Sequence, residues 1–185
     1  MKSPFFKLFS FVCFSILFFF NNSVEVFSQS DYKNNSKNTI YIEGAGAGGY
    51  GSINYEYIYF SPRTFSNNQT SKIAFAFRLG ASTYYLNDYT DTFNPEIIVP
   101  VAIHFLYGKN HKLEVGAGQT ITSFVRASSS DFQPKRDIRN HTHFILGYRY
   151  QKNKGGLMFR IAYTPILEFN TDYQHWGGLA LGYAF

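Results

Sequence analysis

Beyond its first thirty residues, the chain alternates between large apolar and small or polar residues, in segments of about 9 to 13 residues. The segment 179–185 is the clearest example, because its odd-numbered residues are Leu, Leu, Tyr and Phe and its even-numbered residues are Ala, Gly and Ala. Successive side chains of a β-strand point to opposite faces, so this segment has one large apolar face and one narrow face. Such alternation is typical of tilted strands that cross a membrane as part of a β-barrel.

The alternation recurs often enough to predict eight strands. They are a hairpin over 39–60 and single strands near 72–85, 96–108, 111–125, 139–151, 156–167 and 179–185. The span 39–60 could instead be one long strand, but a turn in its glycine-rich run gives the even strand number that brings both ends of a barrel to one side. We therefore expect an all-β protein in which residues 31–185 form one closed antiparallel barrel. An eight-stranded barrel is just wide enough for side chains to fill, which disfavours an open pore.

The predicted connections differ in length at the two ends of the barrel. Two are short, near 108–110 and 152–155, and three are longer, namely 86–95, 126–138 and 168–176. Outer-membrane barrels have short periplasmic turns and longer extracellular loops, so we expect the short connections to face the periplasm. The segment 61–71 is then an unusually long periplasmic turn.

Charged residues occupy the narrow face of these strands. If the large apolar residues face lipid, parity turns six charged residues inward, namely Glu43, Glu56, Arg78, Glu114, Arg149 and Arg160. Three acids and three bases predict a network of paired charges, because an unpaired ion in a narrow, poorly hydrated lumen is costly. Three histidines have matching parity: His104, His141 and His143. A proton or ion path through the lumen is an alternative interpretation of this set.

The N-terminal region has the features of an export signal. A basic start precedes the apolar run Leu8–Phe20, which has the length of a signal-peptide core and is short for a transmembrane helix. We expect residues 1–30 to be a cleaved signal peptide. The only cysteine, Cys13, lies in this run, so we expect no disulfide and no thiol chemistry in the mature chain. No later stretch is apolar over the roughly 18 residues that a spanning helix needs.

Charge and composition limit the partners. The formal net charge is +5, which is too mild to indicate nucleic-acid binding, and export argues against it further. Aromatic residues make up 20% of the chain, and a small exported domain without disulfides needs another source of stability. Insertion into a membrane is one such source.

Three patterns raise catalytic or cofactor chemistry, and each has a simpler explanation. The run Gly44–Gly49 satisfies a GxGxxG pattern, but a strand rather than a helix follows it, so the glycines favour close strand packing over a dinucleotide site. His141 and His143 share a face, yet no cysteine or nearby carboxylate completes a metal site. Ser123 and His143 could form a nucleophile and base, but nothing in the sequence brings them into contact. We expect no catalytic residue, no cofactor and no metal.

The chain resembles small outer-membrane barrel proteins of the OmpA/OmpX type. In detail it resembles a family of uncharacterised barrel proteins common in Bacteroidetes, through the segments Tyr41-Ile42-Glu43, Gly51-Ser52-Ile53-Asn54-Tyr55-Glu56, Leu113-Glu114-Val115-Gly116-Ala117-Gly118, Gly147-Tyr148-Arg149-Tyr150 and Thr164-Pro165. This resemblance implies a fold and a location in the outer membrane, and little about activity.

The segment Leu181-Gly182-Tyr183-Ala184-Phe185 resembles the C-terminal signal that the barrel assembly machinery reads. The resemblance implies that Leu181, Tyr183 and Phe185 form an assembly signal, with Tyr183 and Phe185 at its aromatic positions. It also implies that the assembly machinery is a partner during biogenesis.

These features favour a non-enzymatic barrel with a filled lumen, which serves envelope integrity or binds a ligand through its external loops. The loops carry the aromatic residues Tyr84, Tyr85, Tyr89, Phe93, Phe132, Tyr173 and Trp176, although an aromatic girdle at the membrane interface explains such residues more often. Outer-membrane lipid and lipopolysaccharide are the expected partners, and no sequence feature identifies a surface ligand.

One alternative is an enzyme that modifies lipid A, as some barrels of similar size do, but the His-x-Ser-Asn motif of the deacylase has no match in this sequence. Another is a narrow channel for small hydrophobic molecules.

Overall fold

The computed structural model describes residues 36–61, 72–128, 132–167 and 173–185. The predicted signal peptide and most of the segment 61–71 lie outside them. The described residues form nine strands: β1 (Asn38–Ala45), β2 (Gly51–Phe60), β3 (Ile73–Ala81), β4 (Ile97–Gly108), β5 (His111–Ala127), β6 (Pro134–Gln151), β7 (Gly156–Tyr163), β8 (Ile166–Leu167) and β9 (Gly177–Ala184). Among these residues, no helix is long and apolar enough to cross a membrane.

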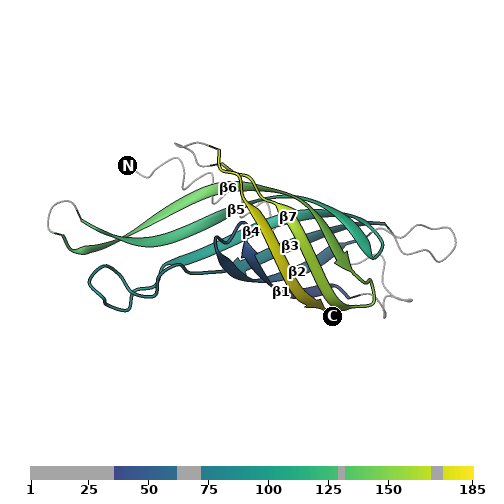
Figure 1. Ribbon diagram of the computed structural model, residues 1–185, viewed down its shortest axis with the longest axis horizontal. Coiled ribbons are helices and arrows are strands. Elements are labelled where there is room, and N and C mark those ends of the chain that lie inside the picture. The colour runs from purple at the N-terminus through teal and green to yellow at the C-terminus, as the bar shows by residue number, and fades with distance from the viewer. Residues whose placement is uncertain (1–35, 62–71, 129–131, 168–172) are drawn as a thin grey trace, which may run out of the picture. The chain divides into compact units, whose positions relative to one another are not determined.

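Eight of these strands form a closed antiparallel barrel (Figure 1). Strands β1 to β7 pair in sequence order, and β9 pairs with β7 on one side and β1 on the other. The longest pairing, β5 with β6, joins what would otherwise be two free edges. Closure gives each of these eight strands a neighbour on both sides, except where the β5–β6 hairpin extends beyond Ser123 and His141 and its two strands pair only with each other. The predicted all-β, eight-stranded barrel is confirmed.

Side chains alternate across the barrel wall in the predicted sense. On β7, for example, Leu157 and Ile161 are exposed on the outside, whereas Met158 and Arg160 are buried inside. The other barrel strands repeat this alternation, with large apolar residues outside and mostly charged, polar or small residues inside, although Tyr41, Ile98, Leu106 and Ile145 are also buried. The molecule is therefore more apolar on its surface than in its interior, which is the reverse of a water-soluble protein.

The span 39–60 is a hairpin, as preferred from the strand count. Its turn, residues 46–49, bends into the barrel: Ala47 is buried, and its carbonyl oxygen accepts a hydrogen bond of 2.9 Å from Oγ1 of the inward-facing Thr120. Gly49 has a φ of +81°, and a Cβ there would lie 1.9 Å from the hydroxyl oxygen of Tyr84. This inward-folded segment, the glycine turn, connects two antiparallel strands with no helix after it, unlike the turn of a dinucleotide site.

Two sequence-based boundaries are corrected. The segment 126–138, expected to be a loop, is largely strand, because β5 and β6 continue to Ala127 and from Pro134. Its polar residues pair across the hairpin, with Arg126 Nη2 and Asp137 Oδ2 2.6 Å apart, so the ladder extends where apolar alternation has ended. The expected strand 156–167 is interrupted at Thr164-Pro165, since proline has no N–H for the ladder, and β8 resumes the pairing with β6 beyond it.

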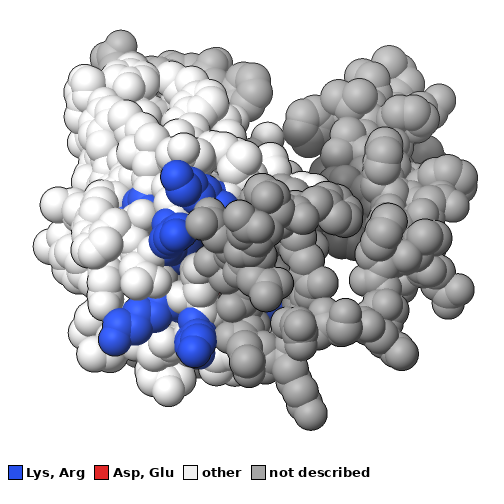
Figure 2. Space-filling model, turned by 90° about the vertical axis from the view of Figure 1, so that its right-hand side faces the viewer, with Lys and Arg blue, Asp and Glu red and all other residues white. Residues whose placement is uncertain are grey.

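The two ends of the barrel differ in charge. The short turns after β4 and β6 lie at one end with Lys109, Lys152 and Lys154. Acids and bases are mixed at the long-loop end, where Asp88, Asp91, Glu96 and Asp137 lie with Arg126, Lys135, Arg136 and Arg139. Figure 2 views the short-turn end, where lysine and arginine are visible among the described residues and no acidic side chain is. The short-turn end is therefore the more basic of the two.

Candidate functional site

The interior of the barrel contains a network of buried charges. Each of the first seven strands contributes one ionisable side chain: Glu43 (β1), Glu56 (β2), Arg78 (β3), His104 (β4), Glu114 (β5), Arg149 (β6) and Arg160 (β7). All are buried, with relative exposures of 2% or less. The six predicted inward charges therefore lie in one cluster together with His104, one of the three histidines of matching parity.

The contacts form a continuous chain through the lumen. Glu43 accepts hydrogen bonds from both Arg78 and Arg160. Arg160 Nη1 also donates to Glu114 Oε1 at 3.0 Å, and Arg149 Nε donates to Glu114 Oε2 at 2.8 Å. Both terminal nitrogens of Arg149 donate to Glu56, Nη1 to Oε1 and Nη2 to Oε2, the second at 2.8 Å. Each carboxylate thus faces a guanidinium. The Arg149–Glu56 pair is bidentate, and bidentate ion pairs are among the strongest hydrogen-bonded contacts in proteins.

Like charges meet in the strand register, and the acids separate them. Arg149 and Arg160 are directly paired across β6 and β7, which places two guanidinium groups side by side. Glu114 reaches between them from β5 and accepts from both. Without Glu114 this pair would be repulsive, because neighbouring like charges in a poorly hydrated site destabilise each other. The network therefore depends on all its members.

Strand β9 contributes no charged side chain to the network, and its small residues leave space for the charged side chains of β1 and β7. Ala180 lies opposite both Glu43 and Arg160 in the ladder, so its small side chain leaves space for their contact. Tyr41 fills the adjoining space, with its ring centroid 4.9 Å from the Arg160 guanidinium carbon and 5.7 Å from that of Arg78. Cations over an aromatic face are attracted to it. Tyr41 was not predicted as a member of this cluster, although it shares the inward parity of Glu43 on β1.

Three members of the network have the geometry of a metal site. Glu56, His104 and Glu114 offer ligand atoms that all lie within 4.8 Å of one another, and His104 Nδ1 is 2.6 Å from Glu114 Oε1. Arg149 already holds both carboxylates, however, so a divalent cation would have to displace or approach a buried guanidinium. The arrangement favours an ion-pair network over metal binding.

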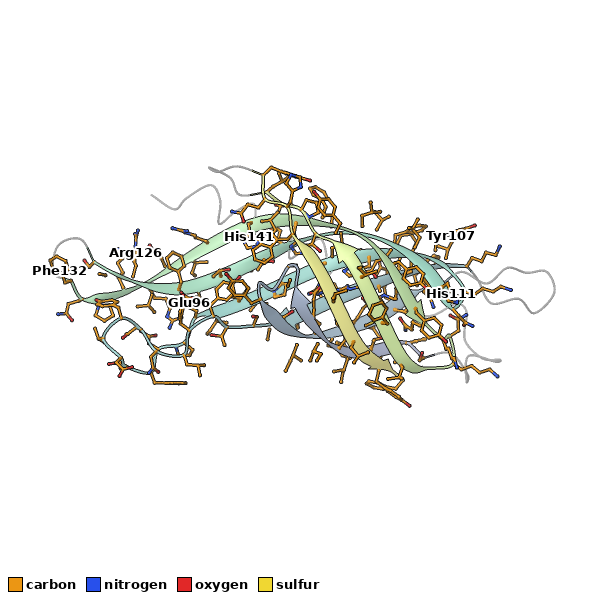
Figure 3. The ribbon with its side chains drawn as sticks, viewed as in Figure 1. Glu96, Tyr107, His111, Arg126, Phe132 and His141 are labelled. Atoms are coloured by element: carbon orange, nitrogen blue, oxygen red, sulfur yellow. The ribbon has the colours of Figure 1, made fainter. Side chains whose placement is uncertain are left out.

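The remaining sequence candidates lie apart. His143 is buried, with its Nδ1 3.2 Å from Thr120 Oγ1, and His141 lies nearer the long-loop end (Figure 3). Ser123 pairs with Ile138, five ladder positions away from the Gly118–His143 pair, and its hydroxyl oxygen accepts a 3.1 Å bond from Arg136. At about 3.3 Å per residue this separation is far beyond the contact that a nucleophile and its base require. The Ser123–His143 pair considered from the sequence is not formed.

The three residues of the predicted assembly signal lie on the outer face of β9 and at its end. Leu181, Tyr183 and Phe185 are all exposed. Phe185 exchanges two backbone hydrogen bonds with Asn38, which joins the end of β9 to the start of β1. The side chains therefore face outward while the backbone completes the closing seam of the barrel.

No protein-family model matches the chain, and no curated protein sequence matches it. Two solved structures are similar to it. The N-terminal β-barrel domain of OprF from Pseudomonas aeruginosa is 15% identical, with a TM-score of 0.49, over 81% of this chain and 99% of that chain. The outer membrane protein Ail from Yersinia pestis, determined in a phospholipid bilayer nanodisc, is 13% identical with a TM-score of 0.46, over the same shares of 81% and 99%. The strand pairing of the chain itself establishes the fold described above.

Proposed function

We propose that the chain is an integral outer-membrane β-barrel without catalytic activity, which serves envelope integrity or surface binding through its long-loop end. The observation that carries this proposal is the inverted distribution of side chains. Leu157 is 69% exposed on the outside of the wall, whereas Arg149 is fully buried inside it. Water would disfavour such an outer surface, and lipid hydrocarbon would cover it.

Two further features support this function. The closed ladder leaves no barrel strand edge exposed to lipid, which is the condition for a β-structure to cross a bilayer. The paired charges fill the lumen at its middle, which supports a role for the wall and the loops rather than for transport. Outer-membrane lipid and lipopolysaccharide are its proposed surroundings, and the barrel assembly machinery its partner during insertion.

Cell fractionation tests the proposal. Full-length protein expressed in a Gram-negative host should be recovered with the outer membrane. An unboiled sample should migrate differently from a boiled one on a semi-native gel, because a closed barrel resists detergent until it is heated. Recovery in the soluble periplasmic fraction, with identical migration of the two samples, would contradict the proposal.

The assembly signal gives a separate prediction. We expect Phe185→Ala to lower the amount of heat-modifiable protein in the outer membrane, because it removes one of the aromatic positions of the proposed signal. Leu157→Ala is the matched control, since it also removes an exposed apolar side chain from the outer wall but lies on β7. Equal yields of the two variants would show that the end of β9 has no special role in assembly.

A further inference from the structure

A cavity of about 620 Å³ lies at the long-loop end of the barrel, beyond the charge network. Figure 3 marks this end with Glu96 and His141, both of which line the cavity. Its volume is within the range of about 300–1,000 Å³ that is typical of small-molecule sites. Charged side chains thus fill the middle of the barrel, and the cavity occupies its long-loop end.

The glycine turn contributes to the lining of this cavity through Ala47 and Gly49. The bond from Thr120 to Ala47 fixes the turn against β5. We call this cavity, which the turn and residues near the long-loop end line together, the cup.

The wall combines aromatic rings with polar groups. Tyr84 and Trp176 stand on either side of Tyr50, with ring centroids 5.3 and 6.0 Å from it, and form an aromatic rim. The guanidinium of Arg139 lies 4.7 Å from the ring centroid of Phe124, and both residues also line the cup. Further polar groups that line the cup are Glu96, Thr122, His141 and Gln174.

Hydrogen bonds hold part of this wall in place. The backbone carbonyl of Trp176 accepts a bond of 2.8 Å from the amide of Thr164, and Gln174 exchanges two backbone bonds with Ile166. The indole Nε1 of Trp176 donates to Gln174 Oε1 at 3.2 Å, which aligns the ring and the amide side by side. This part of the cup is therefore ordered before any ligand binds, which lowers the entropic cost of binding.

We propose that this cup binds a saccharide of one or two sugar rings. The proposal deepens the surface-binding part of the proposed function and rests on it. Glu96 and Arg139 give the lining one acidic and one strongly basic side chain, so no excess charge selects an anion or a cation. A neutral ligand with many hydroxyl groups matches donors and acceptors such as Thr122 and Gln174. The apolar face of a sugar ring matches the aromatic rim, because aromatic side chains combine a large apolar surface with a polar edge.

Tryptophan fluorescence can measure ligand binding in the cup. Trp176 is its only tryptophan and lines the cup, so intrinsic fluorescence reports directly on the site. Purified, detergent-folded protein is titrated with two soluble disaccharides, maltose and N,N′-diacetylchitobiose, and separately with a neutral heptose disaccharide that has the chemistry of the lipopolysaccharide core. The first arm tests sugars from outside the cell and the second tests sugars of the membrane itself. Saturation-transfer NMR on the same samples detects binding that leaves the fluorescence unchanged.

Two amide variants locate the binding. Gln174→Ala removes an amide from the cup, and Asn110→Ala removes an exposed amide from the turn after β4, at the opposite end of the barrel and not among the lining residues. We expect saturable binding in at least one arm. Gln174→Ala should raise the Kd roughly three- to tenfold, as the loss of one or two neutral hydrogen bonds would, and Asn110→Ala should leave it unchanged.

The outcomes separate this proposal from the barrel proposal. Absence of saturable binding in both arms and by both methods, with protein that still shows heat-modified mobility, would overturn the saccharide site and leave the membrane barrel intact. Equal effects of Gln174→Ala and Asn110→Ala would also overturn it, because binding would then lie elsewhere. Binding of glycylglycine in place of any sugar would assign the cup to peptides.

Discussion

Replacing Arg149 with leucine should lower the free energy of unfolding by about 3–5 kcal/mol, the range for removing one partner of a buried ion pair. The guanidinium holds Glu56 through two nitrogens and Glu114 through a third, and all three side chains are fully buried. Leucine would remove both guanidinium bonds to Glu56 and leave Glu114 with Arg160 and His104, in a site with little water. The measurement is the urea dependence of the heat-modifiable gel form in detergent micelles.

Lys154→Leu is the matched control for Arg149→Leu. Lys154 lies in the exposed turn between β6 and β7, so the same change of a base to leucine should alter the free energy of unfolding by no more than about 0.5 kcal/mol. Arg149→Lys should fall between them, because lysine keeps the charge but lacks the planar fork that reaches both acids. Equal losses in Arg149→Leu and Lys154→Leu would mean that the buried network does not stabilise the barrel.

The second large effect is expected at Gly118, where β5 runs closest to its neighbours. A Cβ at this position would lie 2.1 Å from the carbonyl oxygen of Val101 and 2.7 Å from both Ala102 Cβ and His143 Nε2. The first of these atoms is backbone of the adjacent strand and has no rotamer by which to move away. We expect Gly118→Val to cost more than the roughly 1–3 kcal/mol typical of overpacked cores, and to abolish the heat-modifiable form.

Ala117→Val separates crowding from strand propensity. Ala117 is the preceding residue on the same strand, but it is exposed on the outer face. The added methyl groups would point outward there and meet no neighbouring strand, so this variant should assemble as the natural chain does. If Gly118→Val also gave normal heat-modified mobility, the close packing of β4, β5 and β6 around this glycine would be refuted.

Much of the fold could be predicted because a β-barrel is governed by local alternation. Parity alone placed Leu157 outside and Arg160 inside, and the even strand count favoured a hairpin over 39–60. The predicted loop 126–138 was wrong, because the strands continue beyond the point where apolar and polar residues stop alternating. Residues 134–138 continue β6 through backbone pairing with β5, and backbone pairing leaves no hydrophobic signature in the sequence.

The charge network was likewise predictable from the sequence only in part. The sequence identified its six charged members, since each falls on the inward parity of its strand, but could not assign partners among them. Arg149 pairs with Glu56, 93 residues away, because closure and shear of the barrel bring β2 opposite β6. Tyr41 and His104 join the cluster for the same geometrical reason.

By itself, then, the sequence determined which face of each strand points outward and which charges lie inside, because side-chain direction in a strand has a fixed period of two residues. Only the tertiary structure decided where segments far apart in the sequence meet. The glycine turn folds into the mouth of the barrel, Trp176 and Tyr84 come together around Tyr50, and a cup forms above the turn. These contacts depend on ring closure and on the path of the loops, which local periodicity does not encode.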